Sequence, residues 1–233
     1  MSREFGAKEI ESVKEFADLF FRSRYYVRVQ MVLADDEIQF ATGLPGYEYW
    51  VGPITMMDGR PDSDGTARWK PIPSPIDENL IRRIESFLGA KLPPLFKCYL
   101  CASSMLAMDL VVGTLPDIDP RRPLSWLEWC INTWPYGPFN SDPRYVPFTL
   151  GPAFASYLWF DVANPDQDGD YPIIQTMERS SEIATSEKVF DSFAEYFEHL
   201  KLWMKFTQSG LPGHVNTWIQ NNPLKNPPAS YFS

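Results

Sequence analysis

Histidine and cysteine, the residues on which many catalytic and metal sites depend, are scarce in this chain: its 233 residues include two histidines and three cysteines. The G-x-S-x-G, H-E-x-x-H, Walker and G-x-G-x-x-G patterns of common enzymes are missing too. His199 and His214 are too few for a histidine-rich metal site, and no partner residue is evident that would make His199 a general base. The sequence therefore predicts no enzyme, no metal and no cofactor.

An excess of basic residues and a long apolar run are also lacking. The chain has 21 basic and 30 acidic side chains, a formal net charge of -9, so it gains little from the phosphates of a nucleic acid. The best apolar stretch, residues 105–115, is interrupted by Asp109 and cannot span a membrane. Residues 1–5 carry no apolar signal segment, and three cysteines are few for a secreted scaffold. We expect a soluble, cytoplasmic protein that binds neither nucleic acid nor membrane.

The residues that are abundant indicate a folded globular protein, because 44% of the chain is apolar and 15% is aromatic. Helical spacing of apolar residues predicts five helices. Asp77 is a plausible N-cap of the clearest one, and Gly89 is its C-terminal stop. On that helix we expect Phe87 in the apolar stripe and Glu85 facing away from it. The predicted helices cover residues 8–21, 77–88, 95–103, 126–134 and 189–206.

Runs of aromatic and β-branched residues between glycine, proline and aspartate clusters predict the strands. Residues 52–75, rich in proline, glycine and aspartate, are interpreted as a long loop and as an internal boundary. Helices at both ends of a set of strands favour an α+β fold, a mostly antiparallel sheet flanked by helices. The predicted strands cover residues 25–33, 37–42, 47–51, 110–115, 145–150, 157–161 and 171–177.

Two short motifs allow more than one interpretation. Cys98 and Cys101 form a C-x-x-C pattern, but they lie inside an apolar helix, so packing is favoured over a redox pair or a zinc site. Residues 164–170 resemble the start of a calcium loop, yet position 12 of that loop would be Gln175, which cannot supply a bidentate carboxylate. A hairpin turn explains the same asparagine, proline, aspartate and glycine residues.

The acidic side chains are unevenly distributed along the chain. Residues 161–200 contain ten acidic and two basic side chains, a net charge of -8, so all other residues together contribute -1. A concentrated negative field speeds and orients association with a basic partner. The alternative is a solvated acidic surface that keeps the protein soluble.

The order of several motifs resembles the SMI1/KNR4 family of the SUKH superfamily. Residues 81–89 and 92–100 are similar to the family's helix, glycine turn, Leu-Pro and second helix. The Tyr-Val-Pro-Phe, Leu-Trp-Phe-Asp and Tyr-Pro-Ile-Ile stretches between residues 145 and 174 resemble its strands, and residues 190–200 its closing helix. In place of the family's Asn-Gly-Gly-like turn, this chain has Ala-Ser-Ser-Met at residues 102–105.

The resemblance implies three parts: an N-terminal helix-plus-strands extension at residues 1–75, a SUKH-like domain at 76–206, and a tail rich in proline and asparagine at 207–233. It also implies an immunity protein that binds a basic toxin of a contact-dependent or type VI system and blocks it by occlusion. The alternative is an intracellular regulator or scaffold without a toxin partner. The predicted partner-binding residues are Asp166, Asp168, Asp170, Glu178, Trp134 and Tyr136. For Trp134, a place in the core is the competing interpretation.

Overall fold

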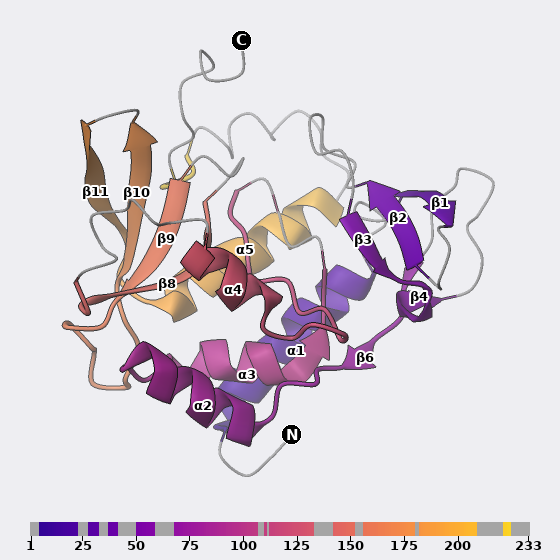
Figure 1. Ribbon diagram of the computed structural model, residues 1–233, viewed down its shortest axis with the longest axis horizontal. Coiled ribbons are helices and arrows are strands. Elements are labelled where there is room, and N and C mark those ends of the chain that lie inside the picture. The colour runs from indigo at the N-terminus through magenta and orange to yellow at the C-terminus, as the bar shows by residue number, and fades with distance from the viewer. Residues whose placement is uncertain are drawn as a thin grey trace.

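Two antiparallel sheets lie at opposite ends of the long axis of the molecule, and the helices lie between and below them (Figure 1). This computed structural model describes residues 5–22, 28–32, 37–41, 50–58, 68–106, 110, 112–132, 142–151, 156–179, 182–208 and 221–224. The combination of helices with antiparallel strands confirms the predicted α+β class.

The larger sheet is an antiparallel meander with strand order β11-β10-β9-β8. Its strands are β8 (Tyr145–Leu150), β9 (Ser156–Asp161), β10 (Ile173–Arg179) and β11 (Glu182–Phe190). Ile173 pairs with Phe160 in the register of β10 and β9, which confirms the predicted hairpin between these strands. The predictions missed β11, whose residues alternate less clearly between apolar and polar.

The smaller sheet contains β1 (Arg28–Val32), β2 (Glu37–Ala41) and β3 (Trp50–Pro53) in sequence order. Two short pairs follow. In the first, β4 (Met57–Asp58) pairs with β5 (Arg68–Trp69); in the second, β6 (Ile72–Pro73) pairs with β7 (Ser103–Ser104). A 3-10 turn at Ile54–Met56 buries Met56 completely. The described part of residues 52–75 therefore contains three short strands and a 3-10 turn with one buried side chain, where the sequence had predicted a long loop.

The helices are α1 (Ala7–Arg22), α2 (Glu78–Leu88), α3 (Pro94–Ala102), α4 (Ser125–Asn132) and α5 (Phe193–Gln208). The Asp77 side chain accepts a hydrogen bond from the Leu80 amide, which confirms the predicted N-cap of α2. Gly89 ends that helix with φ = 67°, a conformation that costs glycine little because it has no Cβ. Residues 110 and 112–115 are largely buried but form no strand of either sheet, so that predicted strand is wrong.

An aromatic cluster around Phe96 of α3 joins the helices to the larger sheet. Phe96 makes edge-to-face contacts with rings from α4, β8, β9 and α5, with ring centroids 5.1 to 5.9 Å apart. Helix α1 belongs to the same core, because the Phe16 ring lies 6.1 Å from that of Tyr99 and 4.7 Å from that of Phe197. Residues 1–75 therefore contribute at least α1 to the core that residues 76–206 share.

Candidate protein-binding surfaces

The turn between β9 and β10 contains the predicted acidic residues Asp166, Asp168 and Asp170. The Asp166 carboxylate accepts hydrogen bonds from the backbone N–H groups of Asp168 (2.8 Å) and Asp170 (2.9 Å). Gly169 has φ = 77°, which closes the turn without a Cβ penalty. These contacts support the hairpin-turn interpretation of the calcium-like motif. Asp166 and Asp168 are both exposed.

Asp170 differs from its two neighbours because its side chain points into the protein and the residue is only 7% exposed. Its carboxylate accepts hydrogen bonds from the amides of Tyr171 (2.8 Å), Phe193 (3.0 Å) and Ala194 (2.9 Å). Burial raises the pKa of Asp170, while the three amide donors act in the opposite direction. Asp170 therefore fastens the turn to the first residues of α5, and its predicted contact with a partner is not supported.

Other carboxylates of residues 161–200 are also used inside the molecule. Arg144 donates two hydrogen bonds, of 2.8 and 2.7 Å, to the buried carboxylate of Asp161 and thereby lowers the pKa of that carboxyl. Glu198 contacts Lys201 of the same helix. The structure thus neutralises part of the predicted acidic face. The exposed acids around the start of α5 are Asp166, Asp168, Asp191 and Glu195, which we call the acidic rim.

The rim residues gather around one junction, because Asp170 joins the β9–β10 turn to α5. Glu195 accepts a hydrogen bond from the Asp191 amide (2.7 Å), and the Asp191 carboxylate pairs with Lys188. The rim retains a net negative charge after this pairing. Of the other predicted contact residues, Trp134 and Tyr136 lie outside the described residues. Glu178 lies on β10, but its side chain is outside the described part.

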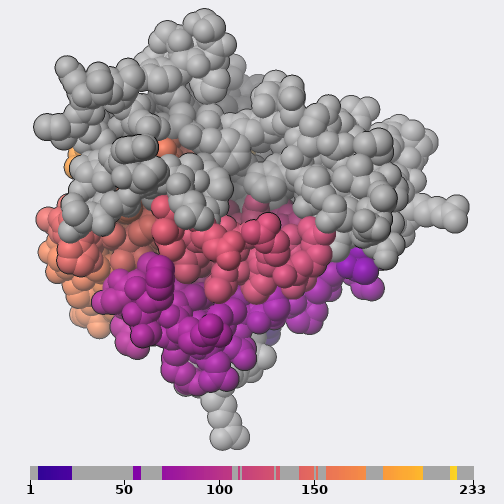
Figure 2. Space-filling model, in the orientation of Figure 1, coloured from indigo at the N-terminus to yellow at the C-terminus, as the bar shows by residue number. Residues whose placement is uncertain are grey.

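A second surface, an apolar groove between α2 and α4, was not anticipated. Its volume is about 510 Å³, and Figure 2 shows the segments that contain the two helices adjoining on the side toward the viewer. Phe87 at 67% and Ile131 at 40% are among the most exposed large apolar side chains of the described residues. The groove is lined by Leu80, Arg83, Ile84, Ser86, Phe87, Leu124, Leu127, Glu128 and Ile131.

The groove exists because α2 has an apolar stripe wider than the core can cover. Ile81 and Ile84 face the core, and Glu85 takes the neighbouring inward position with 6% exposure. The Glu85 carboxylate accepts hydrogen bonds from the Leu92 amide (3.0 Å) and from Lys91 (2.9 Å). Phe87 is left on the outer edge of the stripe. The expectation that Glu85 faces away from the stripe was therefore wrong, whereas Phe87 belongs to the stripe as predicted but lies on its exposed edge.

The cysteines of α3 have the properties of packed side chains. Cys98 and Cys101 are free thiols, and Cys98 is fully buried. Burial raises the pKa of Cys98 to about 12 and that of Cys101 to about 11. A reactive thiol needs the opposite shift, because the thiolate is the nucleophile and the metal ligand. The packing interpretation of the C-x-x-C pattern is therefore supported.

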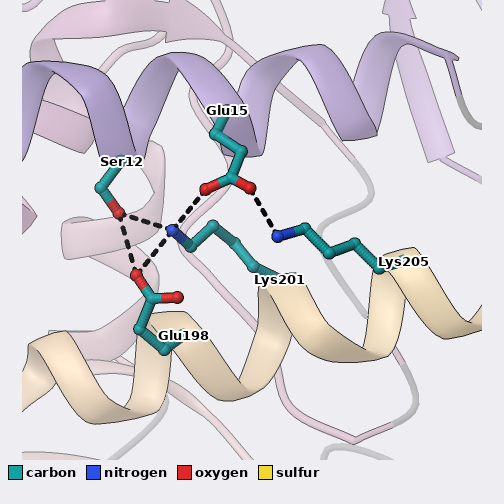
Figure 3. Close-up of polar contacts among 5 residues, drawn as sticks. All are labelled: Ser12, Glu15, Glu198, Lys201 and Lys205. Atoms are coloured by element: carbon teal, nitrogen blue, oxygen red, sulfur yellow. Dashed lines mark hydrogen bonds and ion pairs between the residues drawn. The ribbon is translucent and has the colours of Figure 1, made fainter.

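A buried lysine links α1 to α5, as Figure 3 shows. Lys201 is 3% exposed, and its Nζ lies 3.0 Å from the Ser12 hydroxyl, 2.8 Å from Glu15 and 2.6 Å from Glu198. Lys205 pairs with the other oxygen of Glu15. Burial acts to lower the pKa of Lys201, but the bonds to Glu15 and Glu198 raise it above its ordinary value. The cluster satisfies a buried charge and holds the two helices together.

No protein-family model matches this chain, and no curated protein matches it. Among the described residues, no group of three or more histidine, cysteine, aspartate and glutamate side chains is placed to hold a metal ion. None of the helices in the described ranges combines the length and apolar character that crossing a membrane requires.

Proposed function

We propose that this chain is an immunity protein of the SUKH type, which binds a basic toxin through the acidic rim and blocks it by occlusion. The observation that carries the proposal is that Asp166 and Asp168 are exposed on a turn whose backbone is held in place. Two amide bonds to Asp166 and the attachment of Asp170 to α5 fix this turn before any partner arrives.

A fixed turn favours binding because little conformational entropy is lost when a partner is bound. The rim carboxylates are solvated in the free protein, so their main contribution is to steer a basic partner and to fix its orientation. A toxin that binds nucleic-acid phosphates needs a basic cleft, and an acidic protein surface can occupy that cleft. In this role the protein needs no chemistry of its own.

A second candidate function is an intracellular regulator or scaffold of the SMI1/KNR4 type. The apolar groove between α2 and α4 favours it, because that groove is separate from the rim and suits partners without a basic cleft. This function predicts several partners of moderate affinity. The immunity function predicts one tight partner.

The test is co-expression with the toxin candidate encoded by the neighbouring reading frame. The wild-type protein should rescue growth, and the variant Asp168→Lys with Glu195→Lys should lose rescue because it reverses two rim charges. The matched control is Glu11→Lys with Asp18→Lys on the exposed side of α1, which changes the net charge equally. Equal rescue by both variants would refute the rim as the binding surface.

Binding of the purified pair gives a second readout. The affinity should fall as the salt concentration rises, because salt weakens attraction between exposed charges and at 0.1 M largely screens those more than about 10 Å apart. The rim variant should show a flatter salt dependence than the α1 control. A wild-type affinity that does not change with salt, or no rescue by soluble wild-type protein, would contradict the proposal.

A further inference from the structure

The groove between α2 and α4 has the residue spacing of a site that accepts a third helix. On the α2 side, Leu80, Ile84 and Phe87 follow an i, i+4, i+7 pattern. On the other side, Leu124, which immediately precedes α4, and Leu127 and Ile131 of α4 follow an i, i+3, i+7 pattern. Side chains at these spacings lie along one face of a helix, so two apolar ridges border the groove. An amphipathic helix with its own apolar stripe is the standard occupant of such a groove.

The charge of the groove is opposite to that of the chain as a whole. Arg83 lines the groove, and among the described residues it forms no ion pair. Arg122 and Glu128 pair with each other across 3.2 Å at the α4 side, so their charges cancel. Arg82, the next residue in sequence, lines a different pocket with Asp77 and Glu78, so Arg83 is the cation that the groove itself presents. In a protein with a net charge of -9, this edge is locally positive and selects for a negative partner.

The same arginine disfavours a second copy of this chain as the occupant. A symmetric dimer uses the same patch on both subunits. A second copy would bring the same lining residues, and the acid among them, Glu128, already pairs with Arg122, so it would offer Arg83 no unpaired carboxylate. An acidic residue on a different protein would instead pair with Arg83 at the edge of the apolar contact.

The size of the site sets the length of the occupant. Helix α2 has 11 residues, which corresponds to about 16 Å at a rise of about 1.5 Å per residue. We propose that the α2–α4 groove binds an amphipathic helix of about three turns from another protein, with acidic residues beside its apolar stripe. This site is separate from the acidic rim and requires no toxin.

The probes are two 14-residue synthetic helical peptides with leucine at the same i, i+4 and i+7 positions. One carries glutamate and the other carries lysine at the positions beside the leucines. Fluorescence anisotropy with the full chain at low salt should show the glutamate peptide bound at least about tenfold more tightly, a difference of about 1.4 kcal/mol. Arg83→Glu should reverse the preference, and Phe87→Ala should weaken binding of the glutamate peptide at least about tenfold.

The control variants lie away from the groove on α5 and α1. Leu202→Ala removes another exposed apolar side chain, and Lys14→Glu reverses another exposed charge. Neither should change peptide binding. Circular dichroism would show whether each variant remains folded, and the exposure of Phe87 and Arg83 makes both substitutions compatible with folding.

Three results would overturn the proposal. The first is the absence of binding by the glutamate peptide at millimolar concentration, and the second is equal affinity for the two peptides. The third is a wild-type dimer in sedimentation velocity that Phe87→Ala dissociates, which would assign the groove to a second copy. Because these measurements contain no toxin, their failure would leave the rescue experiment for the acidic rim unaffected.

Discussion

The buried cluster around Lys201 predicts an unusual order of stability among its own variants. Lys201 is the buried member, at 4% side-chain exposure, whereas Glu15 is 40% and Glu198 is 56% exposed. Removing the lysine leaves two carboxylates that water can reach, and Glu15 keeps Lys205 as a partner. Removing both carboxylate charges leaves the ammonium buried and uncompensated, which is the costly case.

We therefore expect Lys201→Met to lower the free energy of unfolding by less than about 1 kcal/mol, because methionine fills the space of the lysine stem. The double variant Glu15→Gln with Glu198→Gln should lower it by about 3 kcal/mol, the lower limit for an unpaired buried charge. For a chain of this length, the corresponding falls in Tm are less than about 4 °C and about 6 to 12 °C. Urea unfolding followed by tryptophan fluorescence measures both differences.

The direction in which stability changes with pH distinguishes an ion-pair role of the Lys201 cluster from packing alone. The hydrogen bond from Lys201 lowers the pKa of Glu15, so the contribution of Glu15 is present above its unfolded pKa of about 4.3. That contribution is lost as the pH falls through the lower folded pKa. The contribution of Lys201, whose pKa is raised, is lost only as the pH rises through that value.

In acid, once the pH has fallen through the lowered pKa of Glu15, the wild-type protein keeps a buried ammonium beside a neutral Glu15. Lys201→Met should then become the more stable protein, with the order reversing as the pH falls from 7 through the lowered pKa of Glu15. A Lys201→Met variant that costs as much as the double glutamine variant at pH 7, or that stays less stable in acid, would refute the reasoning.

Three further predictions concern stability and are checked by the same urea titrations. Glu85→Ala should lower the free energy of unfolding by about 2 to 3 kcal/mol, because the buried Leu92 amide loses its acceptor. Phe87→Ala, on the same helix but 67% exposed, should lower it by less than about 1 kcal/mol. Equal losses would contradict the assigned orientations of the two side chains. Gly89→Ala should lower the free energy of unfolding by about 1 kcal/mol through the φ of 67° alone, because no atom lies within 4 Å of an added Cβ. An alanine variant as stable as the wild type would contradict this prediction. Phe96→Ala should lower the free energy of unfolding by about 3 to 5 kcal/mol, because Phe96 is fully buried among other rings. A loss below about 1 kcal/mol would place Phe96 outside the core.

Local sequence signals predicted several elements of this fold correctly. Asp77 and Gly89 marked the two ends of α2 because capping depends on the residue itself and on the backbone groups within one turn of it. The glycine and aspartates between β9 and β10 indicated a turn for the same local reason. The predicted start of α5 at residue 189 was wrong, because β11 continues to Phe190 through pairing with β10, a contact distant from the helix pattern.

The sequence by itself determined where charge, apolar residues and turn residues lie along the chain, and hence the α+β class. Only the tertiary structure decided which of these side chains face water. The ten acids of residues 161–200 are close in sequence, yet Asp161 and Asp170 turn inward toward Arg144 and the first amides of α5. Periodicity places a side chain relative to the axis of its own helix or strand. Burial depends on which distant element approaches that side, and so Glu85 is buried while Phe87 is exposed.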